Sequence, residues 1–204
     1  MTPDPSTVAP KKSNTPLIIG VTVAVLVFCC ITGGLVAIAI PNYLRFGARS
    51  KQSEVKMNLK AAFASEAAFF LDQSAYSTSV EAVGFMPERG NRYLYLLSTE
   101  GDVQPRNAPI MPIPGEFTGI GPDTLRLGPV DVEAVERAIP RELWNELGVS
   151  GKCPDACSIT IVGAGNLDSD DTIDVWSIST KARTLDGQSV PAGVPHCHVD
   201  DTKE

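Results

Sequence analysis

Residues 36–52, VAIAIPNYLRFGARSKQ, bring an apolar run directly against a charged stretch that favours a helix, with Pro41 at the junction. The two parts are not separated by loop-forming residues. A proline inside a helix removes one backbone hydrogen bond, here to the carbonyl of Ala37, and bends the helix without having to end it. The pattern therefore predicts one long helix that bends at Pro41.

The part of this helix before the proline has the character of a membrane span. Residues 17–40, LIIGVTVAVLVFCCITGGLVAIAI, contain no charged side chain. At about 1.5 Å per residue a helix of this length extends roughly 36 Å, enough to cross a bilayer with some tilt. A cleaved secretory signal has a shorter apolar core. We therefore expect a retained transmembrane helix over 17–40, preceded by a disordered tail over 1–16 that is rich in proline, serine and threonine.

The part after the proline is amphipathic. Its apolar residues recur at spacings of three, four and seven, which places them on one face of a helix; they are Val55, Leu59, Ala62, Phe63 and Phe70. We expect this continuation to cover residues 41–74 and to pack on a globular domain formed by residues 75–204.

The globular part mixes both kinds of secondary structure and predicts an α+β fold. Strands are expected over 93–98 and, as an antiparallel hairpin, over 158–165 and 172–180, where apolar and polar residues alternate around a turn. Short helices are expected in VEAVERAI, capped by Asp131, and in the following RELWNELG. Residues 101–123 are predicted to be an irregular surface loop, and the tail from Pro191 shows no strong pattern.

The overall composition excludes several classes of function. The chain has 204 residues, a formal net charge of −7 and two histidines. An acidic chain is a poor partner for nucleic acid, whose affinity comes mainly from lysine and arginine. No set of side chains resembles a catalytic constellation, so we expect neither an enzyme nor a small-molecule substrate.

The cysteines of the globular part favour an oxidising compartment. The spacing CPDAC predicts a disulfide between Cys153 and Cys157, with Cys157–Cys197 as the alternative. The charges around the apolar run would instead place the domain in the cytoplasm, because Lys and Arg are more numerous on the C-terminal side of the run and such residues usually face the cytoplasm. We place the domain outside the cytoplasm on the strength of the cysteines.

A calcium loop is the favoured candidate metal site. The stretch NLDSDDTID places oxygen-bearing residues at alternate positions, namely Asn166, Asp168, Asp170, Thr172 and Asp174. Oxygen ligands at such spacing suit a hard cation. The match to an EF-hand loop is poor, and a polar turn in which Asn and Asp cap their own backbone is the alternative.

The stretch from Gly33 to Tyr76 resembles the N-terminal helix of type IV pilins and the related pseudopilins. Glycine, an Ala/Ile run, Pro-Asn and an aromatic residue follow one another in GGLVAIAIPNYLRF. The resemblance implies a ladle: a long helix, transmembrane and then amphipathic, packed on a small antiparallel β-sheet. It also implies a single-pass protein of the bacterial inner membrane with a periplasmic or extracellular domain, whose partners are pilin-like subunits or assembly proteins of a pilus or secretion machine. In that family the proline marks a bend in the helix.

The processing site of that family is absent in both possible frames. Prepilins are cut after a glycine, and a glutamate follows the new terminus. In one alignment with the family, Ile19 stands at the position of the glycine and Ala24 at that of the glutamate. In the alignment shifted by one residue, Gly20 and Val25 stand there. We therefore expect a membrane-anchored component that is not processed as a conventional prepilin. The alternatives are a filament subunit with atypical processing and a calcium-dependent binding module on a membrane stalk.

Small residues in the apolar run are candidates for helix contacts. Gly33, Gly34 and Ala37 would let a second membrane helix approach closely. They could equally belong to the family's helix without such a contact.

Overall fold

The structure, a computed structural model, describes residues 15–109, 116–167 and 172–202, with the side chains of 15–27, 38, 40–46 and 48 left out. The chain divides into two compact units, Met1–Phe46 and Gly47–Glu204. Helix α1, Thr15–Gln73, begins in the first unit and ends in the second. Each unit is described by itself.

The first unit consists of the N-terminal part of α1, which continues as helix through Pro41. The one hydroxyl among its described side chains, on Thr32, donates a hydrogen bond to the carbonyl of Phe28 at 2.8 Å, which hides this polar group against the helix backbone. Within the described part of the chain, no helix has the length and apolar character needed to cross a membrane. The predicted span over 17–40 includes thirteen residues whose side chains lie outside that description, so the span stays a prediction, and so does the tail over 1–16.

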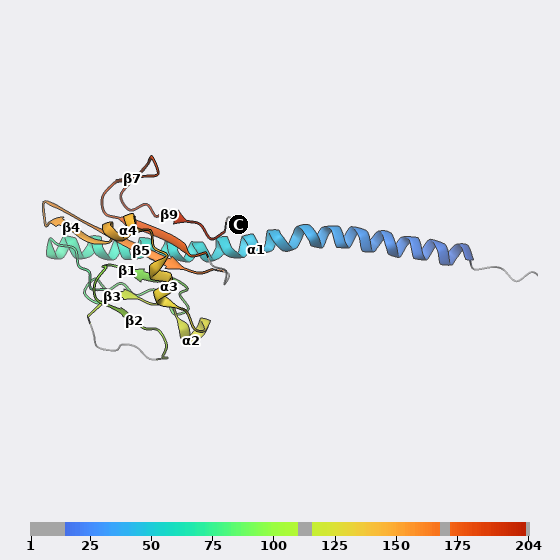
Figure 1. Cartoon of the computed structure of the whole chain (residues 1–204), viewed down its shortest axis with the longest axis horizontal. Helices are drawn as coiled ribbons and strands as arrows, with labels where there is room; N and C mark the ends of the chain where they lie inside the picture. The colour runs from blue at the N-terminus through green and yellow to red at the C-terminus, as the bar shows by residue number, and fades with distance from the viewer. Residues whose placement is uncertain (1–14, 110–115, 168–171, 203–204) are drawn as a thin grey trace, which may run out of the picture. The chain divides into compact units, whose positions relative to one another are not determined.

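The second unit is built on a seven-stranded sheet of order β2-β3-β1-β5-β6-β9, with β4 pairing on β5 (Figure 1). All neighbours are antiparallel except β2 and β3. A separate two-stranded sheet is formed by β7 and β8. The strands are β1 Leu94–Leu96, β2 Asp102–Gln104, β3 Phe117–Ile120, β4 Gly148–Lys152, β5 Ala156–Gly165, β6 Asp174–Ser179, β7 Arg183–Leu185, β8 Gln188–Val190 and β9 His196–Val199. The short helices are α2 Thr124–Leu127, α3 Val132–Arg137 and α4 Arg141–Glu146.

The sheet is buried on both faces, which explains the continuous apolar run YLYLL. Side chains alternate along a strand, so Tyr93, Tyr95 and Leu97 pack in the cluster that contains α1. Leu94 and Leu96 point the other way, into the cluster that contains residues of α3 and α4. The α+β class predicted from the sequence is confirmed.

Several predicted elements are found and others differ. Helix α1 ends at Gln73, next to the predicted end at Ser74. Strands β5 and β6 form the predicted hairpin, and Asp131 caps α3 by accepting a hydrogen bond from the amide of Ala134. The prediction of an irregular loop over 101–123 was wrong, because this segment holds β2 and β3. These strands are short, and each one depends on a partner far away in the sequence rather than on its own pattern.

Helix α1 approaches the sheet closely at Gly163 of β5. A Cβ atom on this glycine would lie 2.6 Å from Cγ2 of Val55, which is shorter than any ordinary contact. Val55, Leu59 and Ala62 are fully buried in the same cluster. The predicted apolar stripe is therefore the surface by which α1 binds the sheet, and a glycine on the sheet sets the distance between them.

A methyl group at this position tests that contact. Gly163→Ala should lower the free energy of unfolding by about 1–3 kcal/mol, the usual cost of overpacking, because Val55 is β-branched and has little rotamer freedom. Thermal unfolding followed by circular dichroism measures the effect. Gly47→Ala, in a helical position where a Cβ meets nothing within 4 Å, serves as the control and should melt at or above the parent temperature. Equal melting of Gly163→Ala and the parent would contradict this account of the packing.

Candidate functional site

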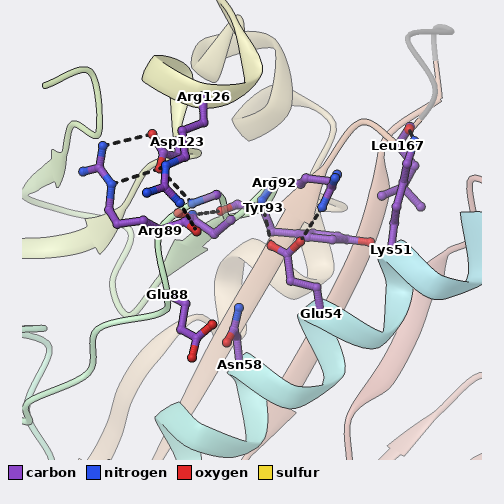
Figure 2. Close-up of polar contacts among 12 residues, drawn as sticks. Lys51, Glu54, Asn58, Glu88, Arg89, Arg92, Tyr93, Asp123, Arg126 and Leu167 are labelled. Carbon is purple, nitrogen blue, oxygen red and sulfur yellow. Dashed lines mark hydrogen bonds and ion pairs between the residues drawn. The ribbon is translucent and has the colours of Figure 1, made fainter. Parts of the chain in front are cut away.

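Polar side chains at the edge of the stripe fasten α1 to the sheet (Figure 2). Glu54 accepts hydrogen bonds from the backbone amide of Arg92 at 2.7 Å and from its guanidinium at 3.2 Å. The amide group of Asn58 donates to the hydroxyl of Tyr95 at 2.8 Å, and Lys51 donates to the carbonyl of Leu167. These bonds fix the helix in position along the strands, since apolar packing alone has little directional preference.

The carboxylate of Asp174, which is 0 % exposed, also holds α1 against the sheet. Its two oxygens accept hydrogen bonds from the hydroxyl of Tyr93 at 2.7 Å, the indole of Trp176 at 2.6 Å, the side-chain amide of Gln52 at 3.0 Å and the backbone amide of Asp201 at 3.3 Å. Burial raises the pKa of this carboxyl, and the four hydrogen bonds act against that rise. A buried charge is tolerated when such donors replace water, so Asp174 joins α1, the residue before β1, strand β6 and the C-terminal segment.

The predicted calcium loop is only partly described. Asp168 and Asp170 lie outside the described residues, while Asn166 and Thr172 are half-buried at either side of them. Asp174, the fifth predicted ligand, is committed to the hydrogen bonds given above. Among the described residues, no group of three or more His, Cys, Asp and Glu side chains is arranged to hold a metal ion. Calcium binding therefore stays a prediction.

A third cluster was not predicted from the sequence. Asp123, also fully buried, accepts hydrogen bonds from the guanidinium of Arg89 at 2.9 and 3.0 Å and from the amide of Gly90 at 2.7 Å; Arg126 lies 3.9 Å away. The adjacent Arg106 is buried, and burial together with Arg89 lowers the pKa of its guanidinium. This cluster ties the chain before β1 to the segment after β3 (Figure 2). No local pattern signals it, because Asp123 stands in a Gly-Pro-Asp sequence typical of exposed turns.

The disulfide predicted between Cys153 and Cys157 is present, with an S–S distance of 2.04 Å. It closes the turn between β4 and β5. The alternative pairing of Cys157 with Cys197 is therefore not formed. The thiol of Cys197 donates to the carbonyl of Val199 at 3.3 Å.

The residues predicted to make helix contacts in the N-terminal part of α1 are exposed where the structure describes them. A Cβ atom at Gly33 or Gly34 would meet no atom of the described chain within 4 Å, and Ala37 is exposed as well. Around them lie exposed apolar side chains, namely Phe28, Ile31, Leu35 and Val36. The side chain of Pro41 lies outside the described ones, so the helix contacts and the bend at Pro41 remain predictions.

Glu66 is a buried acid on the inner side of α1. Its side chain is fully buried, one oxygen accepts a hydrogen bond from the amide of Ser77 at 3.3 Å, and the other has no partner among the described residues. Burial raises the pKa of this carboxyl to about 7, against a smaller opposing effect of the Ser77 amide. Glu66 therefore links the end of α1 to the following segment and takes up a proton near neutral pH.

In the described residues, α1 is thus joined to the sheet by an apolar surface and by buried hydrogen bonds. Residues 46–174 match the family model described as type IV pilin PilA, which covers more than half of the chain. The chain is also 39% identical over 170 residues to the "Type IV major pilin protein PilA" of Myxococcus xanthus (strain DK1622), with 77% of each chain covered. The chain therefore belongs to the type IV pilin family, as the resemblance of its N-terminal helix predicted. Type IV pilins are structural proteins of pili that are membrane-anchored or surface-exposed.

The protonation of Glu66 gives the fold a measurable dependence on pH. The folded pKa near 7 lies above the ordinary value of 4.5, so the folded state binds the proton more tightly and stability falls as the pH rises from about 4.5 to 7. Glu66→Gln should therefore melt above the parent at pH 8, with a gain of about 1–3 kcal/mol for removing a buried charge that lacks partners. Near pH 5 the two proteins should melt close together.

Thermal unfolding at both pH values measures this difference. Glu81→Gln, at an exposed position, is the matched control and should follow the parent at each pH. A Glu66→Gln variant that differs from the parent by the same amount at pH 5 and pH 8 would show that this carboxyl does not titrate as described.

Proposed function

We propose that the protein is a membrane-anchored structural subunit of a type IV pilus or a related secretion machine, and that it keeps its N-terminal segment uncut. The observation that carries the structural role is the exposed apolar surface of α1 around residues 28–36. An exposed apolar patch of this kind marks a surface that binds lipid or another protein. Phe28, for example, is 67 % exposed.

The family supports the same assignment. The relative in Myxococcus xanthus carries the name of a major pilin, and a helix with a free apolar surface suits assembly with further copies or with other pilin-like subunits. The membrane anchor rests on the uncharged run over 17–40, and the placement of the domain outside the cytoplasm is supported by the Cys153–Cys157 disulfide.

The absence of processing rests on the residues at the cleavage slots. In neither frame does a glycine precede a segment with glutamate at the required place, and residues 17–40 contain no acidic side chain. A carboxylate in lipid is costly unless it is paired, and in pilin assembly it is thought to pair with the N-terminal amine of a neighbouring subunit. A subunit without this carboxylate lacks that pairing. The second candidate within the family is a pilus subunit cut at an unusual site.

The N-terminal mass of the protein purified from its native membrane tests this proposal. Our proposal predicts a chain that begins at residue 1 or 2 and is found with the membrane. A chain that begins near Gly20 or Val21, recovered in the sheared filament fraction, would overturn the claim of an uncut anchor and show a processed filament subunit. Recovery of the uncut chain in a soluble fraction without lipid would contradict the membrane anchor.

Calcium binding is a second candidate role, and it would act through the loop after β5. The alternation of oxygen-bearing residues around Asp168 and Asp170 favours it. If calcium binds only the folded state, a concentration of 100 times the dissociation constant stabilises the fold by about 2.7 kcal/mol.

Calcium should then raise the melting temperature and a chelator should reverse the rise. The doubly substituted Asp168→Ala, Asp170→Ala protein should lose the response, whereas Asp155→Ala should keep it. If the parent melts at the same temperature with calcium and with chelator, the proposal of calcium binding is contradicted.

A further inference from the structure

Helix α2 presents two leucines and an arginine to solvent. None of its residues is buried. Leu125 and Leu127 are 48 % and 41 % exposed, and the side chain of Arg126 between them is 61 % exposed. A helical turn that buries nothing adds little to the core, whereas exposed apolar residues beside an arginine are typical of surfaces that bind another protein. We call residues 125–127 the α2 knob.

The α2 knob is held in place by the chain around it. The backbone amide of Leu125 donates to the carbonyl of Arg106 at 3.2 Å, and the amide of Leu127 donates to the carbonyl of Asp123 at 3.0 Å. A surface that is already ordered loses less conformational entropy when it binds. The knob is therefore suited to docking as it stands.

The charge of Arg126 is only partly compensated. Its guanidinium donates to the carbonyl of Arg89 at 3.1 Å, and its Nε atom lies 3.9 Å from the carboxylate of Asp123. That carboxylate already binds the guanidinium of Arg89 at 2.9 and 3.0 Å and the amide of Gly90 at 2.7 Å (Figure 2). Arg126 therefore has a charge and donors left for a further carboxylate.

A cleft of about 410 Å³ lies between α4 and the β7–β8 hairpin. This volume is within the range of roughly 300–1,000 Å³ of pockets that take up a small ligand. Its lining combines apolar side chains with three carboxylates: the apolar ones are Pro140, Leu143 and Leu185, and the carboxylates are those of Glu142, Glu146 and Asp186. We call it the acidic cleft.

The carboxylates of the acidic cleft outnumber the cations beside them. Glu142 is exposed and forms no ion pair with another described residue. Glu146 lies 3.5 Å from the buried guanidinium of Arg183, which compensates one of the three negative charges. The cleft thus lacks partners for the others.

The two histidines beside the cleft do not cancel this charge. Burial lowers the pKa of His198 to about 4, so this ring is uncharged at neutral pH. Nε2 of His196 lies 3.7 Å from the carboxylate of Asp186. Three carboxylates against Arg183 leave the cleft with a net negative charge in either charge state of His196.

The knob and the cleft lie on different sides of the second unit. Figure 1 shows α2 and β7 on opposite sides of the part of α1 in this unit. A chain therefore cannot place its own knob in its own cleft, and the contact has to join two copies. Because the two surfaces differ, such a contact repeats from copy to copy and generates a ring or an open filament.

We propose that the α2 knob of one copy docks into the acidic cleft of a second copy, where Arg126 binds the carboxylates and the two leucines cover the apolar lining. This contact rests on the proposed function, a subunit that assembles with further copies, and it names the surfaces that meet. Copies with a net charge of −7 repel one another, so a pairing of opposite local charges decides which faces join. The cleft of about 500 Å³ between α3 and α4 is a poorer match, because two arginines line it together with two glutamates.

Photo-cross-linking of the full-length protein in its native membrane tests the contact. Benzoylphenylalanine replaces Thr184, an exposed and uncharged residue that lines the acidic cleft. We expect a product with the mass of two chains, in which mass spectrometry places the link at residues 124–128 of the second copy. Arg126→Glu should lower the yield about tenfold or more, as expected for a central arginine of an interface. Arg126→Ala should also lower it, without adding a carboxylate beside Asp123.

Exchange of the charges separates a lost contact from a lost fold. Glu142→Arg should lower the yield by itself, and combined with Arg126→Glu it should restore most of the yield, because the ion pair forms again with its charges exchanged. A misfolded variant would not be rescued in this way. Lys152→Glu and Glu81→Arg make the same charge changes at exposed positions outside both surfaces, and these controls should keep the yield of the parent.

The proposal is overturned if the parent gives no link to residues 124–128, if Arg126→Glu cross-links as well as the parent, or if adding Glu142→Arg restores nothing. An amine-reactive cross-linker applied to the same membranes separates this result from failure of the proposed function. If it joins copies of the parent while position 184 does not, the docking is wrong and the subunit role stands. If it joins no copies either, both the docking and the subunit role are contradicted.

Discussion

The contact between Val55 and Gly163 is the constraint on which the rest of the structure depends. Only a glycine lets the helix come this close to the strand, and Leu59 and Ala62 are buried in the same cluster as Tyr93 and Tyr95. Burying a Leu-sized side chain contributes roughly 1.5–3 kcal/mol, so a few residues hold α1 on the sheet. The apolar surface near residues 28–36 of the same helix is exposed.

Buried polar groups give that packing its specificity. Asp174 gathers donors from four separate parts of the chain, and Asp123 gathers them from the neighbouring residues Arg89 and Gly90. Removing a carboxylate from water is costly, and the cost is offset only when its donors stand in the right places. A shift of α1 by one residue would break the bonds of Gln52, Glu54 and Asn58 together. Glu66 is the exception, since it is buried with one weak hydrogen bond, and this lack of partners raises its pKa to about 7.

The elements predicted correctly are those with a local signal. The stripe from Val55 to Phe70 has a helical period, the segment from Ser158 to Ser179 alternates around a turn, and Asp131 precedes a helix that it caps. The sequence analysis did not predict β4, β7 and β8. It also did not predict β2, β3 and β9, which have three or four residues each. Such strands exist because distant partners supply their hydrogen bonds: β9, for example, pairs with β6.

By itself, the sequence determined the family, the α+β class and the helix with its apolar stripe, and it favoured a disulfide between Cys153 and Cys157 over the alternative Cys157–Cys197. These features depend on period, composition and short spacings, which can be read within one segment. The tertiary structure alone decided that Asp174 turns into the core, that Asp123 binds Arg89, and that Asp186 lies beside His196. Each of these contacts joins residues that are between 10 and 122 positions apart through the pairing of strands and the docking of α1, and no local pattern encodes which donor will face which acceptor.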